Sequence, residues 1–257
     1  MVSLMAPLRQ MPPIALDSTE LKRFGERWNA NEGRLKRSRP ESSLELSNLF
    51  AKAVAEPLAV MLGGVPIVAP NRNVLMPPQA DCVELGDVRI VGGVRPQNFD
   101  VGYRPDGIRF ALDSKTLNDR ESVAKNYQNM INDLATEATT VHSRFPYALV
   151  GFIVGIPAPC LVEPQSGSLV GTLERLARRT LVDEPAHMAE AIALVIWDPD
   201  TGEVLGDLPN GDSPLRIERF SARIEQLYLE RYKGLPPHAE IGEEAEEAEQ
   251  EAEEAGL

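Results

Sequence analysis

The sequence is poor in aromatic residues, cysteines and long apolar runs, and each shortage excludes a class of protein. Only 5% of the 257 residues are Phe, Trp or Tyr, so the core must be built mainly from aliphatic side chains. Two cysteines, Cys82 and Cys160, are too few for a disulfide framework or a structural zinc site, and they favour a reducing compartment. No apolar run approaches the roughly 20 residues of a membrane helix, and no signal-peptide core is visible near residue 1. We therefore expect a cytoplasmic protein that does not span a membrane.

The negative charge is concentrated at one end of the chain. Residues 239–257 contain nine glutamates and no Lys or Arg, and without these nine glutamates the formal net charge falls from −13 to −4. In contrast, residues 34–39 (RLKRSR) carry four basic groups. We expect a solvated acidic tail, with a partner-binding or DNA-mimicking role as the alternative. This charge balance neither requires nor excludes a nucleic-acid partner.

The apolar spacing predicts helices first, then an antiparallel meander, then alternating strands and helices. Residues 1–15 are expected to be an extended arm, and the Pro- and Asn-rich residues 66–78 an irregular connection. The predicted helices cover residues 17–31, 40 or 41 to 61, 119–141, 169–181 and 217–232. The predicted strands cover residues 83–85, 88–91, 98–104, 108–117, 148–156 and 191–197. The resulting fold class is α/β, with a central mixed sheet, helices on both faces, right-handed crossovers and an N-terminal helical segment.

This order suggests three segments. Residues 1–80 would form the N-terminal arm and helical segment, residues 81–238 the main α/β domain, and residues 239–257 the acidic tail. The apolar strands at 148–156 and 191–197 are of the kind that is buried on both faces.

The most informative stretch is a predicted hairpin around Pro105-Asp106-Gly107, a strong turn signal. Apolar and polar residues alternate on both sides of this turn, so each strand has one apolar face. A three-residue bulged loop would shift the register by one, but the apolar pattern opposes this shift. The register that places both apolar faces on the core side pairs Tyr103 with Ile108, Val101 with Phe110 and Phe99 with Leu112.

In that register Asp100 lies opposite Ala111 and diagonal to Asp113, and Lys115 projects from the same face. Diagonal neighbours are about 7–8 Å apart, close enough for two carboxylates to share a cation. Mg²⁺ prefers such oxygen ligands, and the carbonyl of Ser114 would add a third. A metal held there would activate a water, while Lys115 would orient that water or offset charge on a phosphate.

This arrangement resembles the PD-(D/E)xK nuclease superfamily, which includes many type II restriction endonucleases. Asp100 matches the first acid of the family signature, and Asp113-Ser-Lys115 matches its second half. The resemblance covers about residues 83–197. It implies a restriction-endonuclease-like core, Mg²⁺-dependent cleavage of double-stranded DNA and a homodimer, with Asp100, Asp113 and Lys115 as catalytic residues. The literal Pro105-Asp106 pair sits at the turn and is expected to be a decoy.

Further residues are candidates for contact with nucleic acid. In such nucleases the helix after the D-x-K strand often brings a polar side chain over the site, and here Lys125, Gln128 and Asn129 are available; the alternative is that they are ordinary solvated residues. Arg109 is expected on the acidic face, where it would touch phosphate or pair with Asp100 or Asp113. A glutamate from the preceding helix would complete the site, and the sequence does not choose between Glu45 and Glu56.

Other chemistries find little support. His142, His187 and His238 lack metal-ligand spacing, and Cys160 has no evident base. No glycine pair is followed by the Gly-Lys-Ser/Thr of a phosphate loop, so no nucleotide cofactor is expected.

Three functions stay open. The first is a type II restriction endonuclease, and the second is a repair, recombination or mobile-element nuclease that reads DNA structure. The third is a non-catalytic binding module in which the acidic face is a salt-bridge ladder on the sheet.

Overall fold

The computed structural model describes residues 7–33, 41–71, 74–121, 123–161 and 165–238. The side chains of residues 41–43, 124, 125, 165 and 166 are not described either. The basic segment 34–39 and the acidic tail 239–257 therefore lie outside the described residues, as do the first six residues of the predicted arm.

A six-stranded mixed sheet, in the order β1-β2-β3-β4-β5-β6, forms the centre of the α/β fold. β2, β3 and β4 form an antiparallel meander, while β1 is parallel to β2, and β4, β5 and β6 are parallel to one another. The strands are β1 (Ile67–Val68), β2 (Val83–Val91), β3 (Pro96–Tyr103), β4 (Phe110–Thr116), β5 (Leu149–Pro157) and β6 (Ala191–Trp197). The helices are α1 (Ser18–Ala30), α2 (Glu41–Met61), α3 (Val123–His142), η1 (Ala158–Cys160), α4 (Gln165–Leu176) and α5 (Ile217–Tyr232).

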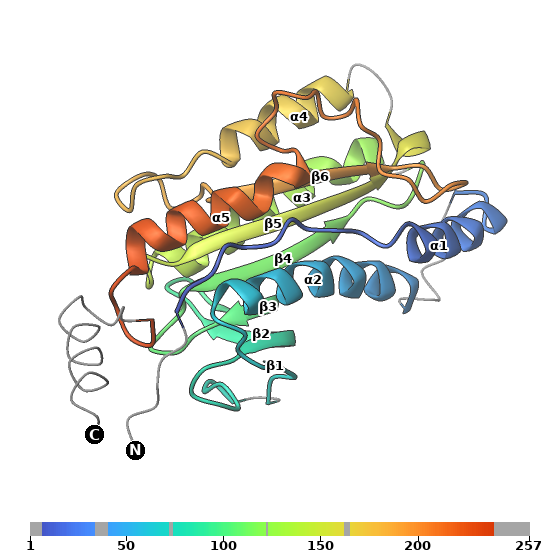
Figure 1. Cartoon of the computed structure of the whole chain (residues 1–257). Helices are drawn as coiled ribbons and strands as arrows, with labels where there is room; N and C mark the ends of the chain where they lie inside the picture. The colour runs from blue at the N-terminus through green and yellow to red at the C-terminus, as the bar shows by residue number, and fades with distance from the viewer. Residues whose placement is uncertain (1–6, 34–40, 72–73, 122, 162–164, 239–257) are drawn as a thin grey trace, which may run out of the picture.

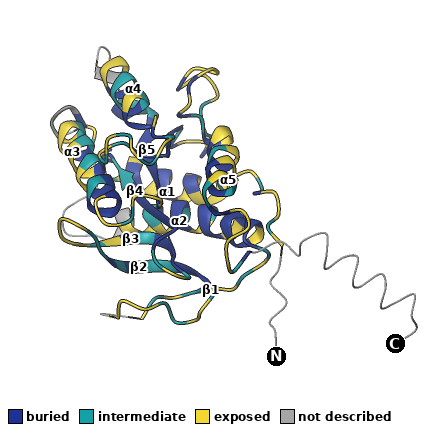
Figure 2. Cartoon of the chain, turned by 90° about the vertical axis from the view of Figure 1, so that its left-hand side faces the viewer, coloured by how far each residue is buried: buried dark blue, intermediate teal, exposed yellow. Residues whose placement is uncertain are grey.

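Helices cover both faces of this sheet (Figure 1). Seen from the side, α3 and α4 lie on one face, and α1, α2 and α5 lie on the other (Figure 2). α2 packs on β2, β3 and β4, and α5 packs on β5 and β6. The buried residues concentrate where the sheet meets the two helical layers (Figure 2). The predicted mixed sheet with helices on both faces is therefore confirmed.

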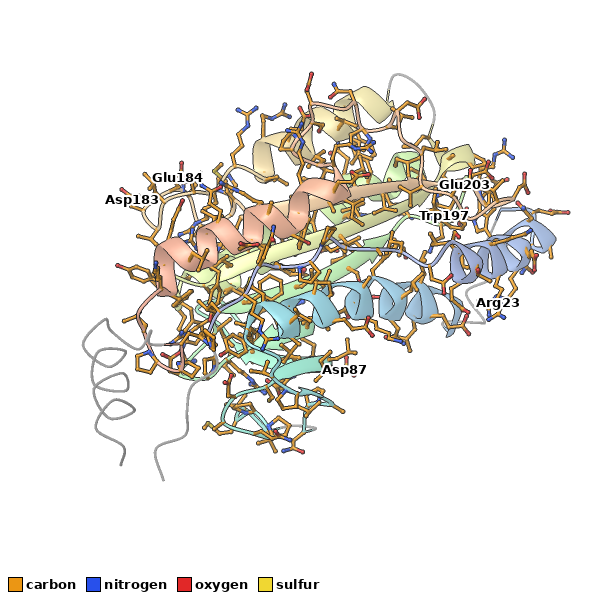
Figure 3. The ribbon with its side chains drawn as sticks, in the orientation of Figure 1. Arg23, Asp87, Asp183, Glu184, Trp197 and Glu203 are labelled. Atoms are coloured by element: carbon orange, nitrogen blue, oxygen red, sulfur yellow. The ribbon has the colours of Figure 1, made fainter. Side chains whose placement is uncertain are left out.

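The core runs through the sheet without a break between the predicted segments. Every residue of β5 and β6 is buried, as expected for apolar strands that are covered on both faces. α1 begins after the N-cap Asp17, whose carboxylate accepts hydrogen bonds from the backbone N–H groups of Thr19 and Glu20. Its Phe24 packs edge-on against Trp197 at the end of β6, with ring centroids 5.7 Å apart. Figure 3 shows Trp197 beside α1.

Some local expectations need correction. The predicted strands 83–85 and 88–91 form one strand, β2, with an irregularity between Leu85 and Val88. Gly86 adopts a φ of 129° there, a conformation that favours glycine. The stretch 66–78, predicted to be irregular, contains the short strand β1.

The hairpin register differs from the prediction by two residues. Val101 pairs with Leu112 and Tyr103 with Phe110, which leaves residues 104–109 as the connection. Ion pairs of two buried arginines accompany the longer loop: Arg104 binds the buried Glu84 of β2, and Arg109 binds the exposed Asp106 within the loop. A shift by two residues keeps both apolar faces on the core side, because strand side chains alternate with a period of two.

None of the described helices combines the length and the apolar character that crossing a bilayer requires.

Candidate active site

The candidate residues meet where β3 and β4 separate. The last residue pair between the two strands is Val101 with Leu112. Asp100 and Asp113 are the next residues beyond this pair, one on each strand. The two aspartates are thus opposite one another, and not diagonal as predicted. Beyond this point the backbone N–H of Ser114 donates to Oδ2 of Asp100 at 2.9 Å. A carboxylate of β3 therefore takes the place of a backbone carbonyl.

Hydroxyl groups hold Asp100 from the α2 side of the sheet. Its Oδ2 accepts hydrogen bonds from Oγ of Ser47, at 3.0 Å, and from Oγ of Ser114. The two serine Oγ atoms are 2.5 Å apart. Burial, followed by the negative charge of Asp113, raises the pKa of Asp100 to about 6, although the bonds from the two serines lower it.

A second cluster forms around Lys115. Its ammonium contacts Oδ2 of Asp113 and donates to Oε1 of Glu137 in α3 at 2.8 Å. Burial and then the Glu137 carboxylate raise the pKa of Asp113 to about 7, with Lys115 acting in the opposite direction. Burial opposes the charged form of Lys115, but the two carboxylates together outweigh it, so the pKa of this lysine is raised. Lys115 therefore stays protonated at neutral pH.

Glu137 is a buried acid, and only one of its two carboxylate oxygens accepts hydrogen bonds from described residues. It is only 3% exposed, and its Oε1 accepts both from Lys115 and from the Gln97 side chain at 3.0 Å. Its Oε2 is buried and has no hydrogen-bond partner among the described residues. Buried carboxylate oxygens are normally paired, so this oxygen marks a position that a cation or a water would fill.

Three residues that contact the site, namely Ser47, Glu137 and Gln97, were not predicted from the sequence. The periodicity does contain a signal for two of them. Glu137 interrupts the apolar stripe of α3, since it lies three residues after Leu134 and four before Val141. Ser47 lies three residues before the buried Phe50 on the inward side of α2. A polar residue at a core position of an amphipathic helix is the pattern to look for.

The structure places several other candidates away from this site. The side chain of Glu45 pairs with Arg27 and that of Glu56 with Lys52, so neither glutamate completes the site. Arg109 is also placed wrongly by the prediction. It is 2% exposed, binds Asp106 and the Pro236 carbonyl, and stacks on the Tyr232 ring, because the longer loop turns it toward the C-terminal residues.

The polar residues predicted on the helix after the D-x-K strand do lie on α3. Gln128 and Asn129 are exposed there, and Gln128 donates to the hydroxyl of Tyr127. Lys125 belongs to the same helix, but its side chain lies outside the described residues. Contact of these residues with nucleic acid stays a prediction.

The site has the kinds of oxygen donors that a divalent cation binds, but these donors are not gathered around one point. Within the described ranges, no group of three or more His, Cys, Asp or Glu side chains is gathered closely enough to hold a metal ion. Lys115 contacts both Asp113 and Glu137, and the Glu137 carboxylate lies close enough to Asp113 to raise its pKa. However, Asp113 and Glu137 both contact the one ammonium of Lys115, the pKa values of Asp113 and of the neighbouring Asp100 are raised, and Oε2 of Glu137 has no hydrogen-bond partner among the described residues. Asp100, Asp113 and the Ser114 carbonyl are the oxygen donors that Mg²⁺ would use.

Cys160, His142 and His238, among the residues that the structure describes, do not form a second catalytic arrangement. Burial raises the pKa of the Cys160 thiol to about 12, which disfavours a thiolate nucleophile. His142 and His238 are buried and hydrogen-bonded, to Glu190 and Tyr103 respectively.

Comparisons with protein-family models, with curated proteins and with solved structures give no match for this chain.

Proposed function

We propose that this protein is a Mg²⁺-dependent nuclease of the PD-(D/E)xK type that hydrolyses phosphodiester bonds in DNA. One observation carries the proposal: the two predicted acids lie opposite one another where β3 and β4 separate, and the predicted lysine contacts the second acid. The meander, the following helix and the buried parallel strand support a restriction-endonuclease-like core around them.

In this proposal each residue has the role that its surroundings allow. Asp100 and Asp113 would hold the cation, which when bound polarises the phosphate and lowers the pKa of a water. Ser47 and Ser114 orient Asp100 without adding charge. Lys115 has a raised pKa, so it suits stabilisation of the negative charge that grows on the phosphate and does not suit removal of a proton.

The biological role that we favour is type II restriction of foreign DNA. One active site per chain cuts one strand, so cleavage of both strands by this enzyme requires a homodimer. A repair, recombination or mobile-element role would use the same site on nicked or branched DNA.

A second candidate function has its own observation. Lys115 is already bound by two carboxylates, as it would be in a salt-bridge ladder on a non-catalytic binding module. The unpartnered Oε2 of Glu137 and the surplus of negative charge speak against this interpretation.

The test is cleavage of plasmid and phage DNA in the presence of Mg²⁺. The variants Asp113→Asn and Lys115→Met remove the proposed machinery, and Asp87→Asn and Lys22→Met, at exposed positions, are the matched controls. We expect about a hundredfold or greater loss of rate in the first pair and none in the controls. Discrete bands would support restriction, and a preference for nicked or branched DNA would support repair. Absence of cutting on all these substrates by the folded wild-type protein would overturn the proposal in favour of the binding module.

A further inference from the structure

A group of arginines stands apart from the candidate active site, at the start of β6. Arg178, which follows α4, and Arg219 and Arg223 of α5 line a cavity of about 580 Å³ together with Glu184 and Ile192. This volume is in the range of ligand-binding pockets. Figure 3 shows Glu184 beside α5.

These arginines are oriented by backbone carbonyls rather than neutralised by acids. Arg223 donates to the carbonyls of Glu190 and Arg179 and to the hydroxyl of Thr180. Arg178 donates to the Glu174 carbonyl. Among the described residues, neither has a carboxylate within 4.0 Å, whereas Arg23, Arg104 and Arg179, for example, each have an acidic partner.

The third arginine of the cavity is only weakly paired. Arg219 donates to the Gly211 carbonyl at 3.0 Å, and its nearest acid is the fully exposed Asp212, at 4.0 Å. Arg219 and Arg223 are four residues apart on one helix, a spacing at which like charges repel. An anion between them would remove this repulsion.

The acids of the cavity do not cancel its positive charge. The Glu184 carboxylate accepts from the backbone N–H groups of Thr180 and Leu181, and these bonds lower its pKa, so it stays ionised. The Glu190 carboxylate is bound by Arg179, Arg231 and His142. The lining therefore has three guanidinium groups against the one free-standing carboxylate of Glu184.

We propose that the cavity lined by Arg178, Arg219 and Arg223 is a binding site for phosphate groups, carried by a free polyphosphate or by a nucleic-acid backbone. Guanidinium groups bind phosphate oxygens with two parallel hydrogen bonds, and a phosphate carries enough negative charge to balance the surplus of the lining.

The position of the cavity connects it to the candidate active site. Asp113 pairs with Phe152, and Phe152 pairs with Ile192, so the cavity borders a strand that is two places away from Asp113. With neighbouring strands about 4.8 Å apart, the two backbones are roughly 10 Å apart at this level. This separation runs across the buried strand β5, so it places the cavity and Asp113 in neighbouring parts of the sheet without defining a surface path between them. Phosphate binding at the cavity does not require cleavage.

The experiment is a calorimetric titration of the full chain with inorganic tripolyphosphate, without divalent metal. The variant is Arg178→Gln/Arg219→Gln, because both arginines are exposed and their described bonds go to backbone carbonyls. The control is Arg23→Gln/Arg175→Gln, which removes the same charge from exposed positions outside the cavity. Circular dichroism and thermal unfolding serve as the controls for correct folding of both variants.

We expect the cavity variant to bind tripolyphosphate about tenfold or more weakly than the wild type, and the control to bind it normally. A second titration with a short fluorescent DNA duplex identifies the source of the phosphate. If the source is a nucleic-acid backbone, duplex affinity also falls and the slope of log K against log salt decreases by about two. If only tripolyphosphate binding is lost, the ligand is a free phosphate compound. The proposal is overturned if the wild type does not bind tripolyphosphate, or if the cavity variant binds it as tightly as the control.

Discussion

Two buried charge clusters in this molecule have opposite balances. Glu190 is fully buried, and its carboxylate binds His142, Arg179, Arg231 and the Val150 N–H. Burial alone would raise its pKa, but these partners outweigh burial and lower it to about 2. Where β3 and β4 separate, two carboxylates, those of Asp113 and Glu137, share the one ammonium of Lys115, and beside them lies Asp100, whose partners among the described residues are hydroxyl and N–H groups. The pKa values of Asp100 and Asp113 rise to about 6 and about 7.

The difference is the basis of the roles that we propose for the two clusters. In the Glu190 cluster one carboxylate is fully compensated by two guanidinium groups and a histidine, and its bonds connect α3, β5, β6 and α5. The Asp100–Asp113 cluster lacks positive charge, and the buried Oε2 of Glu137 lacks a partner. Burial of like charges without compensation destabilises a fold, so such a cluster is expected where an added cation supplies what is missing.

The largest effect is expected from breaking the satisfied cluster. Glu190→Gln leaves two buried arginines and a histidine without their carboxylate. We expect a loss of about 3–5 kcal/mol in the free energy of unfolding, measured by urea denaturation. Asp113→Asn should cost far less without metal, since it removes surplus negative charge. Equal losses in the two variants would remove the distinction between the clusters.

The second prediction concerns pH. The folded-state pKa values of Asp100 and Asp113 lie above their unfolded values, so the folded protein binds more protons between about pH 4 and pH 7. Stability should therefore fall as pH rises through this window. Glu190 acts in the opposite sense, because its pKa is lowered, and its contribution is lost as pH falls from about 4.5 to about 2.

Chemical denaturation at a series of pH values measures both slopes. The double variant Asp100→Asn/Asp113→Asn should flatten the decline between pH 4 and pH 7 and leave the acid limb unchanged. An unchanged decline in this variant would assign it to other groups.

A smaller effect on stability is expected from removing the Ser47 hydroxyl of α2. Ser47→Ala removes one hydrogen bond to Oδ2 of Asp100, which costs about 1 kcal/mol of stability and raises the pKa of Asp100 further. NMR titration of the carboxyl carbon measures this pKa. A pKa that stays at its wild-type value would show that Ser47 does not orient the acid.

The smallest effect is expected at the two glutamates that the sequence offered as completing the site. Glu45→Gln and Glu56→Gln remove exposed ion pairs, so stability should change by less than about 0.5 kcal/mol. The DNA cleavage rate should equal that of the wild type. A large loss of cleavage in either variant would require a different arrangement of α2.

The helices and strands were predicted well where the spacing of the apolar residues matched the residue types typical of that secondary structure. The extents of β6 and α5 were predicted as the structure has them, because an apolar run and a clear helical stripe mark them. The alternation on the two strands, together with the resemblance to a nuclease signature, singled out Asp100, Asp113 and Lys115 as candidates, and their role stays a prediction. Their pairing was wrong by two residues because the register depends on Arg104 and Arg109, whose ionic partners Glu84 and Asp106 cannot be read from the apolar pattern.

The wider environment of the site was beyond the sequence for a related reason. Glu137 reaches Lys115 across 22 residues, and Ser47 reaches Asp100 across 53, so both contacts depend on how α2 and α3 pack on the sheet. Periodicity shows that these residues face inward, but it does not show which strand residue each of them meets.

The most direct test of the account is calorimetric titration of the full chain with Mg²⁺ near pH 7, in two buffers of different ionisation enthalpy. Because Asp100 and Asp113 have pKa values of about 6 and about 7, a cation that binds them should release protons. We predict saturable Mg²⁺ binding with proton release in the wild type, and loss of both in Asp113→Asn. Absence of binding by the folded wild-type protein, or equal binding by the variant, would contradict it.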